Sequence, residues 1–235
     1  MSVKAVLFDL DGTLLPMDQE QFVKAYLSHM AAKMAPHGYD PKQLVETIWK
    51  GTAAMIKNDG SSRNENVFWN QFTNVFGQES LKDVPLFEEF YRKEFGLVRE
   101  VCGHSPLAAR VITRVKEKGL RAVLATNPIF PAIATENRMR WAGLSPDDFE
   151  LYTTYENSRY CKPNPAYYRD ILDRLGLSPE ECVMVGNDVQ EDMITQTMGM
   201  RVFLLTDCLI DREKTDLSRY PNGGFEQLLA FIDAL

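Results

Sequence analysis

Short apolar segments alternate with helical patterns along most of the chain, and this alternation constrains the fold more than any other feature. The apolar segments cover residues 5–8, 122–125, 150–153, 182–185 and 202–205. Each is short enough for a strand that is buried on both faces, and most of them precede a helical pattern. Strands that alternate with helices form a parallel sheet with helices on both faces, so the sequence predicts an α/β fold.

The expected helices carry start and stop signals. Ser105 and Pro106 supply an N-cap residue and a proline at the first helical position, and Gly119 follows as a stop. The other helices expected in the alternating part span residues 131–141, 165–175 and 225–234, and one follows Asp188. These signals place helices between successive strands, as a parallel sheet requires.

Residues 16–98 interrupt the alternation, because they contain helical stripes of apolar residues and no convincing strand. The stripes are Val23, Leu27, Met30 and Met34; Val45, Ile48, Thr52 and Met55; Phe68, Phe72 and Val75; Leu86 and Phe90. The pattern predicts a helical domain over 16–98, inserted into a core made of 1–15 and 99–235. Within the insert, the polar residues Arg63, Asn64 and Asn66 are expected in a solvated loop rather than in contact with a substrate.

The charge and the apolar runs argue against two classes of function. The formal net charge is −7 and no basic stripe is present, so the chain is not expected to bind nucleic acid. No apolar run approaches the length of a membrane span, and residues 1–10 lack the pattern of a signal peptide. The four cysteines form no CxxC pair, which favours free thiols in a reducing compartment. A cytoplasmic enzyme or binding protein is expected.

Two carboxylates, Asp9 and Asp11, directly follow the first apolar segment. Ligands of parallel sheets bind at the carboxyl ends of the strands, and residues two apart in an extended chain project to the same side. Both carboxylates are therefore expected to face one crevice, where their mutual repulsion requires a cation or a shared proton. The alternative for Asp11 and Gly12 is a simple turn, because Asp-Gly is a common turn pair.

Two weaker signals follow later in the chain. Thr126 and Asn127 end an apolar segment, where a hydroxyl and backbone amides can hold a phosphate oxygen, although Ser and Thr end many strands. Lys162 is held in an extended segment by Pro163, although a lone lysine is usually a solvated charge. Neither signal is specific by itself.

A further signal lies after the segment 182–185, where Gly186 is followed by Asn187, Asp188 and Asp192. Helix capping by Asp188 explains part of this pattern. The order of all the signals is far more specific than any one of them: DxDGT, a Thr at the end of a strand, Lys-Pro, and a Gly followed by spaced acids.

In this order the motifs resemble those of the haloacid dehalogenase-like hydrolase superfamily, in its phosphatase branch. The resemblance covers residues 3–15 and about residue 99 to the C-terminus. It implies a Rossmann-like core with a helical cap inserted after the first strand. The insert resembles that cap only in its position and its helical character.

The resemblance implies catalysis through an aspartyl-phosphate intermediate. Asp9 matches the nucleophile that attacks phosphorus, and Asp11 matches the acid that protonates the leaving oxygen and later activates water. Thr126, with Asn127 beside it, would bind the phosphoryl group. Lys162 would neutralise Asp9 and the charge on the phosphoryl oxygens.

The resemblance also implies a magnesium site. Asp9, the backbone carbonyl of Asp11 and Asp188 would hold Mg²⁺, with Asp192 in support, because Mg²⁺ takes a few carboxylates together with waters and substrate phosphate. Many relatives have Gly-Asp where this chain has Gly186 and Asn187, so either Asn187 or Asp188 takes the ligand position. Asp188 is preferred because a carboxylate is the better ligand.

The function implied is a Mg²⁺-dependent phosphatase that acts on a small phosphorylated metabolite. Dehalogenases of the superfamily lack the second acid, which is present here as Asp11, and no GxSxG motif supports a serine hydrolase. A sugar phosphomutase, a phosphonatase and a non-catalytic binding protein on the same fold remain as alternatives. Phosphonatases use a cap lysine, and the expected cap offers Lys24, Lys33, Lys50 and Lys57. The oligomeric state cannot be read from the sequence.

Overall fold

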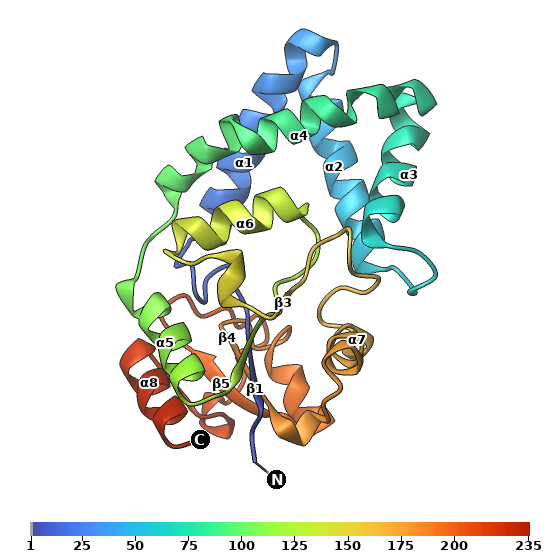
Figure 1. Cartoon of the computed structure of the whole chain (residues 1–235). Coiled ribbons are helices and arrows are strands. Elements are labelled where there is room, and N and C mark those ends of the chain that lie inside the picture. Colours follow the sequence, from blue (N-terminus) through green and yellow to red (C-terminus); the bar gives the residue numbers. More distant parts are fainter. Residues whose placement is uncertain (1) are drawn as a thin grey trace.

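A parallel sheet forms the base of the molecule (Figure 1). The computed structural model describes residues 2–235, and within them the sheet has six strands in the order β3-β2-β1-β4-β5-β6. Every neighbouring pair of strands is parallel. The strands are β1 (Ala5–Phe8), β2 (Arg121–Leu124), β3 (Leu151–Tyr152), β4 (Cys182–Gly186), β5 (Arg201–Leu205) and β6 (Asn222–Gly223).

The helices fall into an inserted group and a group that alternates with the strands. The inserted group is α1 (Gln19–Met34), α2 (Pro41–Ile56), α3 (Asn64–Phe76) and α4 (Val84–Arg92). The alternating group is α5 (Pro106–Glu117), α6 (Ala132–Trp141), α7 (Pro165–Leu175) and α8 (Phe225–Asp233). Short 3₁₀ helices cover Ala35–His37, Gln78–Asp83, Glu94–Val101, Pro146–Asp148, Pro179–Glu181, Met193–Met198 and Leu217–Arg219.

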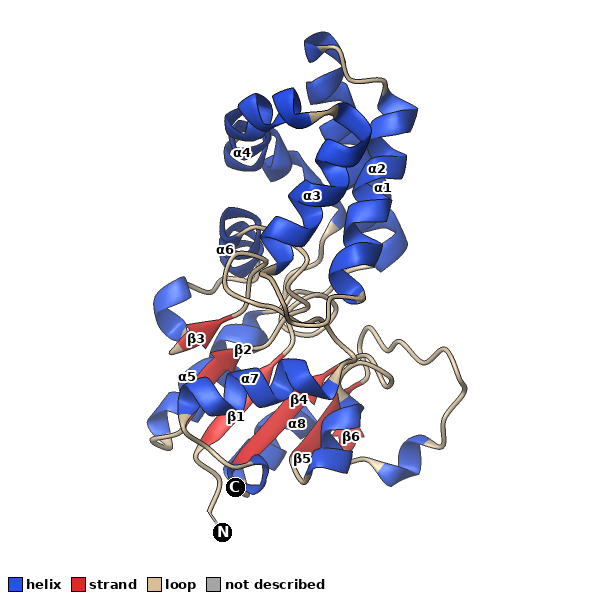
Figure 2. Cartoon of the chain, turned by 90° about the vertical axis from the view of Figure 1, so that its right-hand side faces the viewer, coloured by secondary structure: helices blue, strands red, loops and turns tan. Residues whose placement is uncertain are grey.

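Helices cover both faces of the sheet (Figure 2). Helices α5 and α8 pack beside each other against one face, and α7 packs against the other. Alternate residues of β1 divide between the two sides: Val6 and Phe8 join the first layer, and Ala5 and Leu7 join the second. Because β1 is buried on both faces, its sequence is continuously apolar rather than alternating.

The strand register aligns the carboxyl ends of the three central strands. Phe8 of β1 lies beside Leu124 of β2 and Val185 of β4. The pairing continues one residue further, because the Asp9 amide donates to the Val185 carbonyl at 2.9 Å. The polar residues that follow these strands therefore start from one edge of the sheet, where ligands of such sheets bind.

Helices α1 to α4 form a bundle beyond this edge (Figures 1 and 2). The chain enters the bundle after β1 and leaves it before α5. The two connections lie side by side: Met17 forms an antiparallel bridge with Cys102, and the Gly103 amide donates to the Pro16 carbonyl at 2.7 Å. The inserted bundle is thus joined to the sheet by a paired linker.

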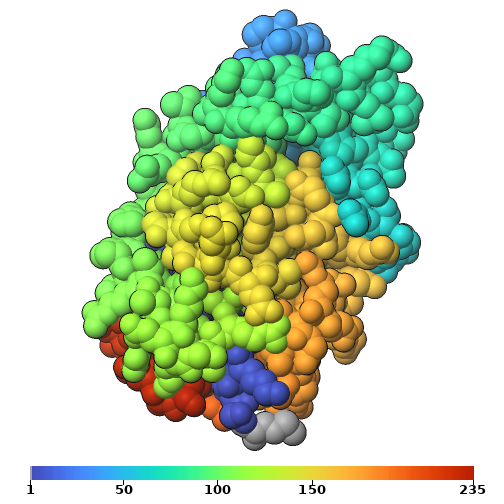
Figure 3. Space-filling view, in the orientation of Figure 1, coloured from blue at the N-terminus to red at the C-terminus, as the bar shows by residue number. Residues whose placement is uncertain are grey.

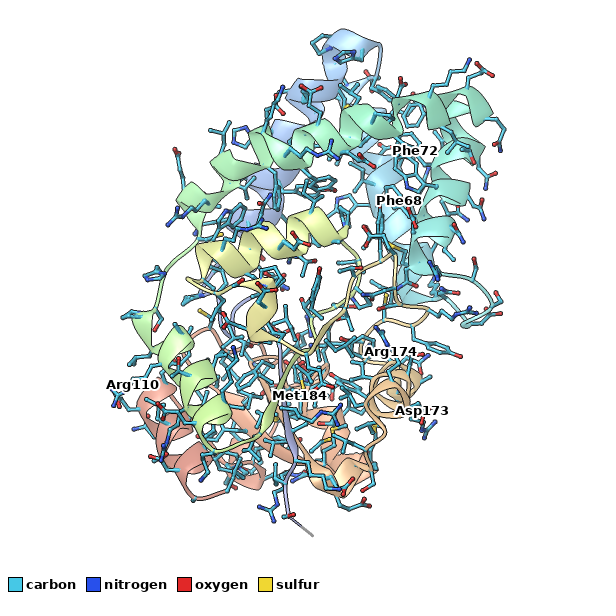
Figure 4. The ribbon with its side chains drawn as sticks, in the orientation of Figure 1. Phe68, Phe72, Arg110, Asp173, Arg174 and Met184 are labelled. Atoms are coloured by element: carbon cyan, nitrogen blue, oxygen red, sulfur yellow. The ribbon has the colours of Figure 1, made fainter. Side chains whose placement is uncertain are left out.

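Aromatic rings pack the interior of the bundle. Phe68 and Phe72, labelled on α3 in Figure 4, stack with their ring centroids 6.1 Å apart. Gly51 lets α2 approach α3, because a Cβ at this position would lie 2.5 Å from the Phe68 ring. Met184, labelled on β4 in the same figure, is fully buried in the sheet.

The bundle and the sheet share one continuous cluster of buried apolar side chains. Trp141 of α6 packs on Phe95 with ring centroids 5.0 Å apart, and Phe130 packs on Tyr26 at 5.3 Å. Figure 3 shows residues 128–160 in yellow directly below the insert in green and cyan. The division into a core of 1–15 and 99–235 and a cap of 16–98 stays a prediction.

The structure confirms the α/β class and corrects two details. Strand β6 was not predicted, because two residues carry no usable pattern. The helix expected after Asp188 is a turn followed by the 3₁₀ helix Met193–Met198. The Asp188 carboxylate accepts from the amides of Gln190 and Glu191, each at 3.0 Å, and this local bonding competes with a regular helix.

Within residues 2–235, no helix combines the length and the apolar character that crossing a membrane would require.

Candidate active site

A cavity of about 540 Å³ opens between the carboxyl edge of the sheet and helices α1 and α2 of the insert. Six of the seven residues predicted for the site line it: Asp9, Asp11, Thr126, Asn127, Asp188 and Asp192. The seventh, Lys162, lies directly behind them and is hydrogen-bonded to two of them. Asp9 and Asp188 are more than 170 residues apart in the sequence, but they lie at the same cavity because β1 and β4 are neighbours in the sheet.

A buried network of charges fixes the Asp9 carboxylate. Lys162 Nζ donates to Asp9 Oδ1 at 2.8 Å and to Asp192 Oδ1 at 2.7 Å, and the lysine side chain is 1% exposed. The Thr13 hydroxyl lies 3.1 Å from the other oxygen, Asp9 Oδ2, and shares its single proton between that oxygen and Asn187 Oδ1. Burial alone would lower the pKa of Lys162, but the carboxylates of Asp192 and Asp9 raise it well above its usual value. The two carboxylates therefore favour the charged form of Lys162 beside Asp9.

Both carboxylate oxygens of Asp192 have partners. Oδ1 accepts from Lys162, and Oδ2 accepts from the Asp188 amide at 3.1 Å. Gly186 makes room for this arrangement, because a Cβ there would collide with the Asp192 carboxylate. This geometry makes Asp192 a residue that orients Lys162, and its role at a metal ion stays a prediction.

The Asp11 carboxylate has a different environment from that of Asp9. Its Oδ2 accepts from Arg138 Nη1 on α6, while its Oδ1 is buried and has no hydrogen-bond partner among residues 2–235. Burial raises the pKa of the Asp11 carboxyl to about 6, although Arg138 opposes the shift. Asp11 therefore takes up a proton more readily than an ordinary aspartate, which suits a group that gives and receives protons.

Arg138 is a site residue that sequence reasoning missed. Its side chain is fully buried, and its guanidinium carbon lies 4.4 Å from the centre of the Phe130 ring. Nε donates to the Ala134 carbonyl and Nη2 to Thr135 Oγ1, each at 3.3 Å. The only signal available was its position in the expected helix 131–141, because the sequence did not show that this side of the helix is buried.

Asn187 and Asp188 have clearly different surroundings. Asn187 Oδ1 accepts from Thr13 Oγ1 at 2.8 Å, and its Nδ2 donates to the Cys208 carbonyl at 2.7 Å. Asp188 Oδ2 instead pairs with Arg212 Nη1 at 2.7 Å, and the arginine side chain is half exposed. Asn187 thus ties three loops together, whereas Asp188 carries a negative charge at the cavity.

Thr126 and Asn127 extend β2 into the cavity. The Thr126 carbonyl accepts from Thr153 Oγ1 at 2.7 Å and from the Tyr167 hydroxyl at 2.8 Å, so the backbone is fixed behind its side chain. Asn127 Nδ2 donates to Glu191 Oε2 at 3.2 Å, and its Oδ1 accepts from the Lys162 amide at 3.3 Å. Asn127 therefore connects the end of β2 with the segment that carries the lysine.

One residue expected in a solvated loop is buried instead. Asn64 begins α3, is 0% exposed, and accepts from Asn58 Nδ2 at 2.8 Å. Its own Nδ2 donates to the Pro128 carbonyl at 3.1 Å. Asn64 thus attaches the insert to the loop after β2. Arg63 and Asn66 are exposed, as expected, but Asn66 lies within α3 and not in a loop.

The residues present fit a magnesium ion. Within residues 2–235, no three His, Cys, Asp or Glu side chains converge on one point. Mg²⁺ needs only one or two carboxylates besides waters and phosphate, and the carboxylates of Asp9 and Asp188, which both line the cavity, would meet that number. One cationic group, the half-exposed guanidinium of Arg212, already pairs with the Asp188 carboxylate.

Comparisons with known proteins find hydrolases and phosphatases that this chain resembles. The model of the haloacid dehalogenase-like hydrolase family matches residues 3–195. The chain is 28% identical over 220 residues to glyceraldehyde 3-phosphate phosphatase of Methanothermobacter thermautotrophicus, with 92% of each chain covered. It is 26% identical over 188 residues to hexitol phosphatase A of Escherichia coli, covering 79% of this chain and 74% of that protein.

Solved structures share the fold over the whole chain. A phosphatase from Thermococcus onnurineus superimposes with a TM-score of 0.60 at 19% identity and covers 98% of both chains. A 2-haloacid dehalogenase from Pseudomonas syringae superimposes with a TM-score of 0.62 at 22% identity, over 99% of this chain and 98% of that one. At these identities the similarity establishes the fold alone.

Proposed function

Because the chain belongs to the haloacid dehalogenase-like hydrolases, we propose that it is a Mg²⁺-dependent phosphatase acting through a phosphorylated Asp9. The observation that carries this proposal is the Asp9 carboxylate, held 2.8 Å from the buried Lys162 ammonium at the floor of the cavity. A second carboxyl, Asp11, lies two residues away and lines the same cavity. The phosphatases among the relatives support the same reaction.

In the first step, an Asp9 oxygen attacks phosphorus and forms a new phosphorus–oxygen bond. The bond between phosphorus and the leaving oxygen breaks, and Asp11 gives its proton to that oxygen. Lys162 stabilises the charge on the phosphoryl oxygens, and Thr126 with Asn127 orients the group. Asp192 keeps Lys162 in place throughout.

In the second step, water attacks the same phosphorus atom. Asp11, now ionised, takes a proton from that water, and the bond between phosphorus and Asp9 breaks. Inorganic phosphate leaves, and both carboxyl groups return to their starting states. The two acids have different roles, and their surroundings differ: Lys162 pairs with Asp9, whereas Arg138 pairs with Asp11.

Asp9, Asp188 and the backbone carbonyl of Asp11 would hold the magnesium ion. When bound, Mg²⁺ neutralises phosphoryl charge and reduces the repulsion between the phosphate and the carboxylates. In this proposal Asn187 keeps the loops in register and does not bind the ion.

The substrate is a small phosphorylated metabolite, because the insert covers the cavity and leaves about 540 Å³. A phosphonatase is less well supported. Of the four lysines considered for that reaction, Lys24 lines the cavity, but its side chain is exposed, and a Schiff-base amine needs a desolvated site.

The direct test is phosphate release from an aryl phosphate, with Mg²⁺ and with excess chelator. The chelator should abolish turnover and added Mg²⁺ should restore it. Asp9→Asn should remove turnover under both conditions, which controls for a contaminating phosphatase. Undiminished release in excess chelator, or from the Asp9→Asn variant, contradicts the proposal.

A further inference from the structure

The roof of the active-site cavity exposes large apolar side chains. Trp49 is 51% exposed and Ile56 is 43% exposed, although both are large hydrophobic residues that are normally buried. Both line the cavity, together with Thr52 between them. The spacing of three and then four residues puts all three on one face of α2, so this face is turned toward the site and not into the bundle.

Neighbouring elements extend the apolar roof. Val23 of α1, and Ile129 and Phe130 from the loop after β2, line the same cavity. Among residues 2–235, Lys24 is the one cationic side chain that lines it, and Glu20 lies beside it on α1. The roof therefore offers apolar contact, and it offers little attraction for a second negative charge on the substrate.

The geometry of phosphoryl transfer directs the leaving group toward this roof. The attacking oxygen and the leaving oxygen lie roughly in line on opposite sides of phosphorus. Asp9 attacks from the floor of the cavity, so the leaving group points away from the sheet, toward α1 and α2. The roof is thus the surface that contacts the part of the substrate released as an alcohol.

A second, more enclosed cavity of about 60 Å³ adjoins the roof. Thr52, Ile129 and Phe130 line both cavities, so the two are neighbours. The wall of the smaller one is largely aromatic, with the rings of Phe68 and Trp69 among its members. Its volume accommodates about two water-sized groups. Because the lining is largely aromatic, an apolar group is favoured there over water.

We propose that the substrate is a phosphate monoester whose leaving group is a planar, apolar alcohol that packs on Trp49 and Ile56. This inference rests on the proposed phosphatase activity and specifies its substrate class. Burial of an aromatic ring against exposed tryptophan and isoleucine removes apolar surface from water on both sides. A polyol phosphate, or an ester with a second anionic group, would bury much less apolar surface against these side chains and would bind less tightly for that reason.

The test compares two esters that leave as primary alcohols, 2-phenylethyl phosphate and glycerol 1-phosphate. With similar chemistry at phosphorus, their ratio of kcat/KM reports contact with the leaving group. We expect the wild-type protein to favour the phenylethyl ester by about tenfold or more. Trp49→Ala should reduce that ratio about tenfold, and Ile56→Ala should reduce it in the same direction.

The matched control is Leu81→Ala, because Leu81 is also in the insert and 42% exposed but does not line the cavity. This variant should keep the wild-type ratio. A wild-type preference for glycerol 1-phosphate, or an equal loss for both esters in Trp49→Ala, overturns the inference while leaving the phosphatase proposal intact. If neither ester nor an aryl phosphate is hydrolysed, the proposed function fails and this inference fails with it.

Discussion

The two sides of the active-site cavity differ in the side chains that form them. The floor, at the carboxyl edge of the sheet, consists mainly of charged residues, and the roof, on α1 and α2, is largely apolar. On the floor, Lys162 is buried between Asp9 and Asp192, and each of these charges has a partner within 2.8 Å. On the roof, Trp49 and Ile56 expose large apolar surfaces to the cavity. The floor is held by paired charges in the absence of a substrate, whereas the roof leaves apolar surface exposed to the cavity.

This difference has a physical origin. Charges removed from water are tolerated only where they are paired, so each floor residue depends on its neighbours. Apolar contact is not directional, so a roof residue can change and alter the fit of the leaving group without disturbing the charges below. Substitutions in the floor are therefore expected to reduce turnover of every substrate strongly. Substitutions in the roof are expected to change the relative kcat/KM for different substrates by smaller amounts.

The largest effect is expected from Lys162→Met, which removes the buried cation from the floor. Asp9 and Asp192 would be left buried without their counter-charge, which should lower the free energy of unfolding by about 3–5 kcal/mol. Loss of the charge that stabilises the phosphoryl oxygens should reduce kcat by about 10²–10³-fold or more. Urea unfolding and turnover of an aryl phosphate measure the two effects.

The matched control for that change is Lys24→Met on the roof. Because Lys24 is exposed and lies outside the charge network, its replacement should leave the free energy of unfolding within about 0.5 kcal/mol of the wild type. If both substitutions lower the free energy of unfolding equally, the charges of Lys162, Asp9 and Asp192 do not depend on one another.

The next largest effect is expected from Arg138→Met, which removes the partner of Asp11. An acid that is no longer held in position should protonate the leaving oxygen poorly. The loss should therefore be about tenfold greater for an alkyl phosphate than for an aryl phosphate, whose leaving group needs less help. The kcat values for the two esters give this ratio, and Arg138→Lys should restore part of it.

Arg140→Met is the control for Arg138, because Arg140 lies on the same helix but its side chain is exposed and pairs with Glu136. It should show no dependence on the leaving group. A loss in Arg138→Met that is the same for both esters would mean that Arg138 supports the fold without positioning Asp11.

A smaller effect, on the metal requirement, should separate the two candidate ligands on the floor. Asp188→Ala should raise the Mg²⁺ concentration needed for half-maximal activity by about tenfold or more, since a carboxylate ligand is lost. Asn187→Ala should raise it least, because Asn187 bonds to Thr13 and the Cys208 carbonyl. Asp192→Ala should fall between the two. If Asn187→Ala has the greatest requirement, the ligand position is one residue earlier.

The sequence predicted the polar residues at the ends of the strands better than it predicted the side chains that reach them, or the sheet, from the insert and from α6. The continuous apolar run of β1 fixed the place of Asp9, because the carboxyl ends of parallel strands share an edge. The expectation that Asn64 lies in a solvated loop was wrong, because its burial depends on contact with the Pro128 carbonyl, 64 residues away. Arg138 was missed for the same reason, because its partner Asp11 is 127 residues away and is identified only by the packing of α6. Long-range contacts between polar residues leave no periodic pattern in a sequence.

The central claim is that Asp9 becomes phosphorylated, and trapping the intermediate tests it most directly. The Asp11→Asn variant should form the phosphoenzyme from an aryl phosphate with Mg²⁺, because such a leaving group needs little protonation, but should hydrolyse it slowly. Denaturing mass spectrometry after an acid quench should then show a gain of one phosphoryl group, on the peptide that contains Asp9. The double variant Asp9→Asn, Asp11→Asn should show no gain. A phosphoryl group on any other residue, or its persistence in the double variant, would contradict the account.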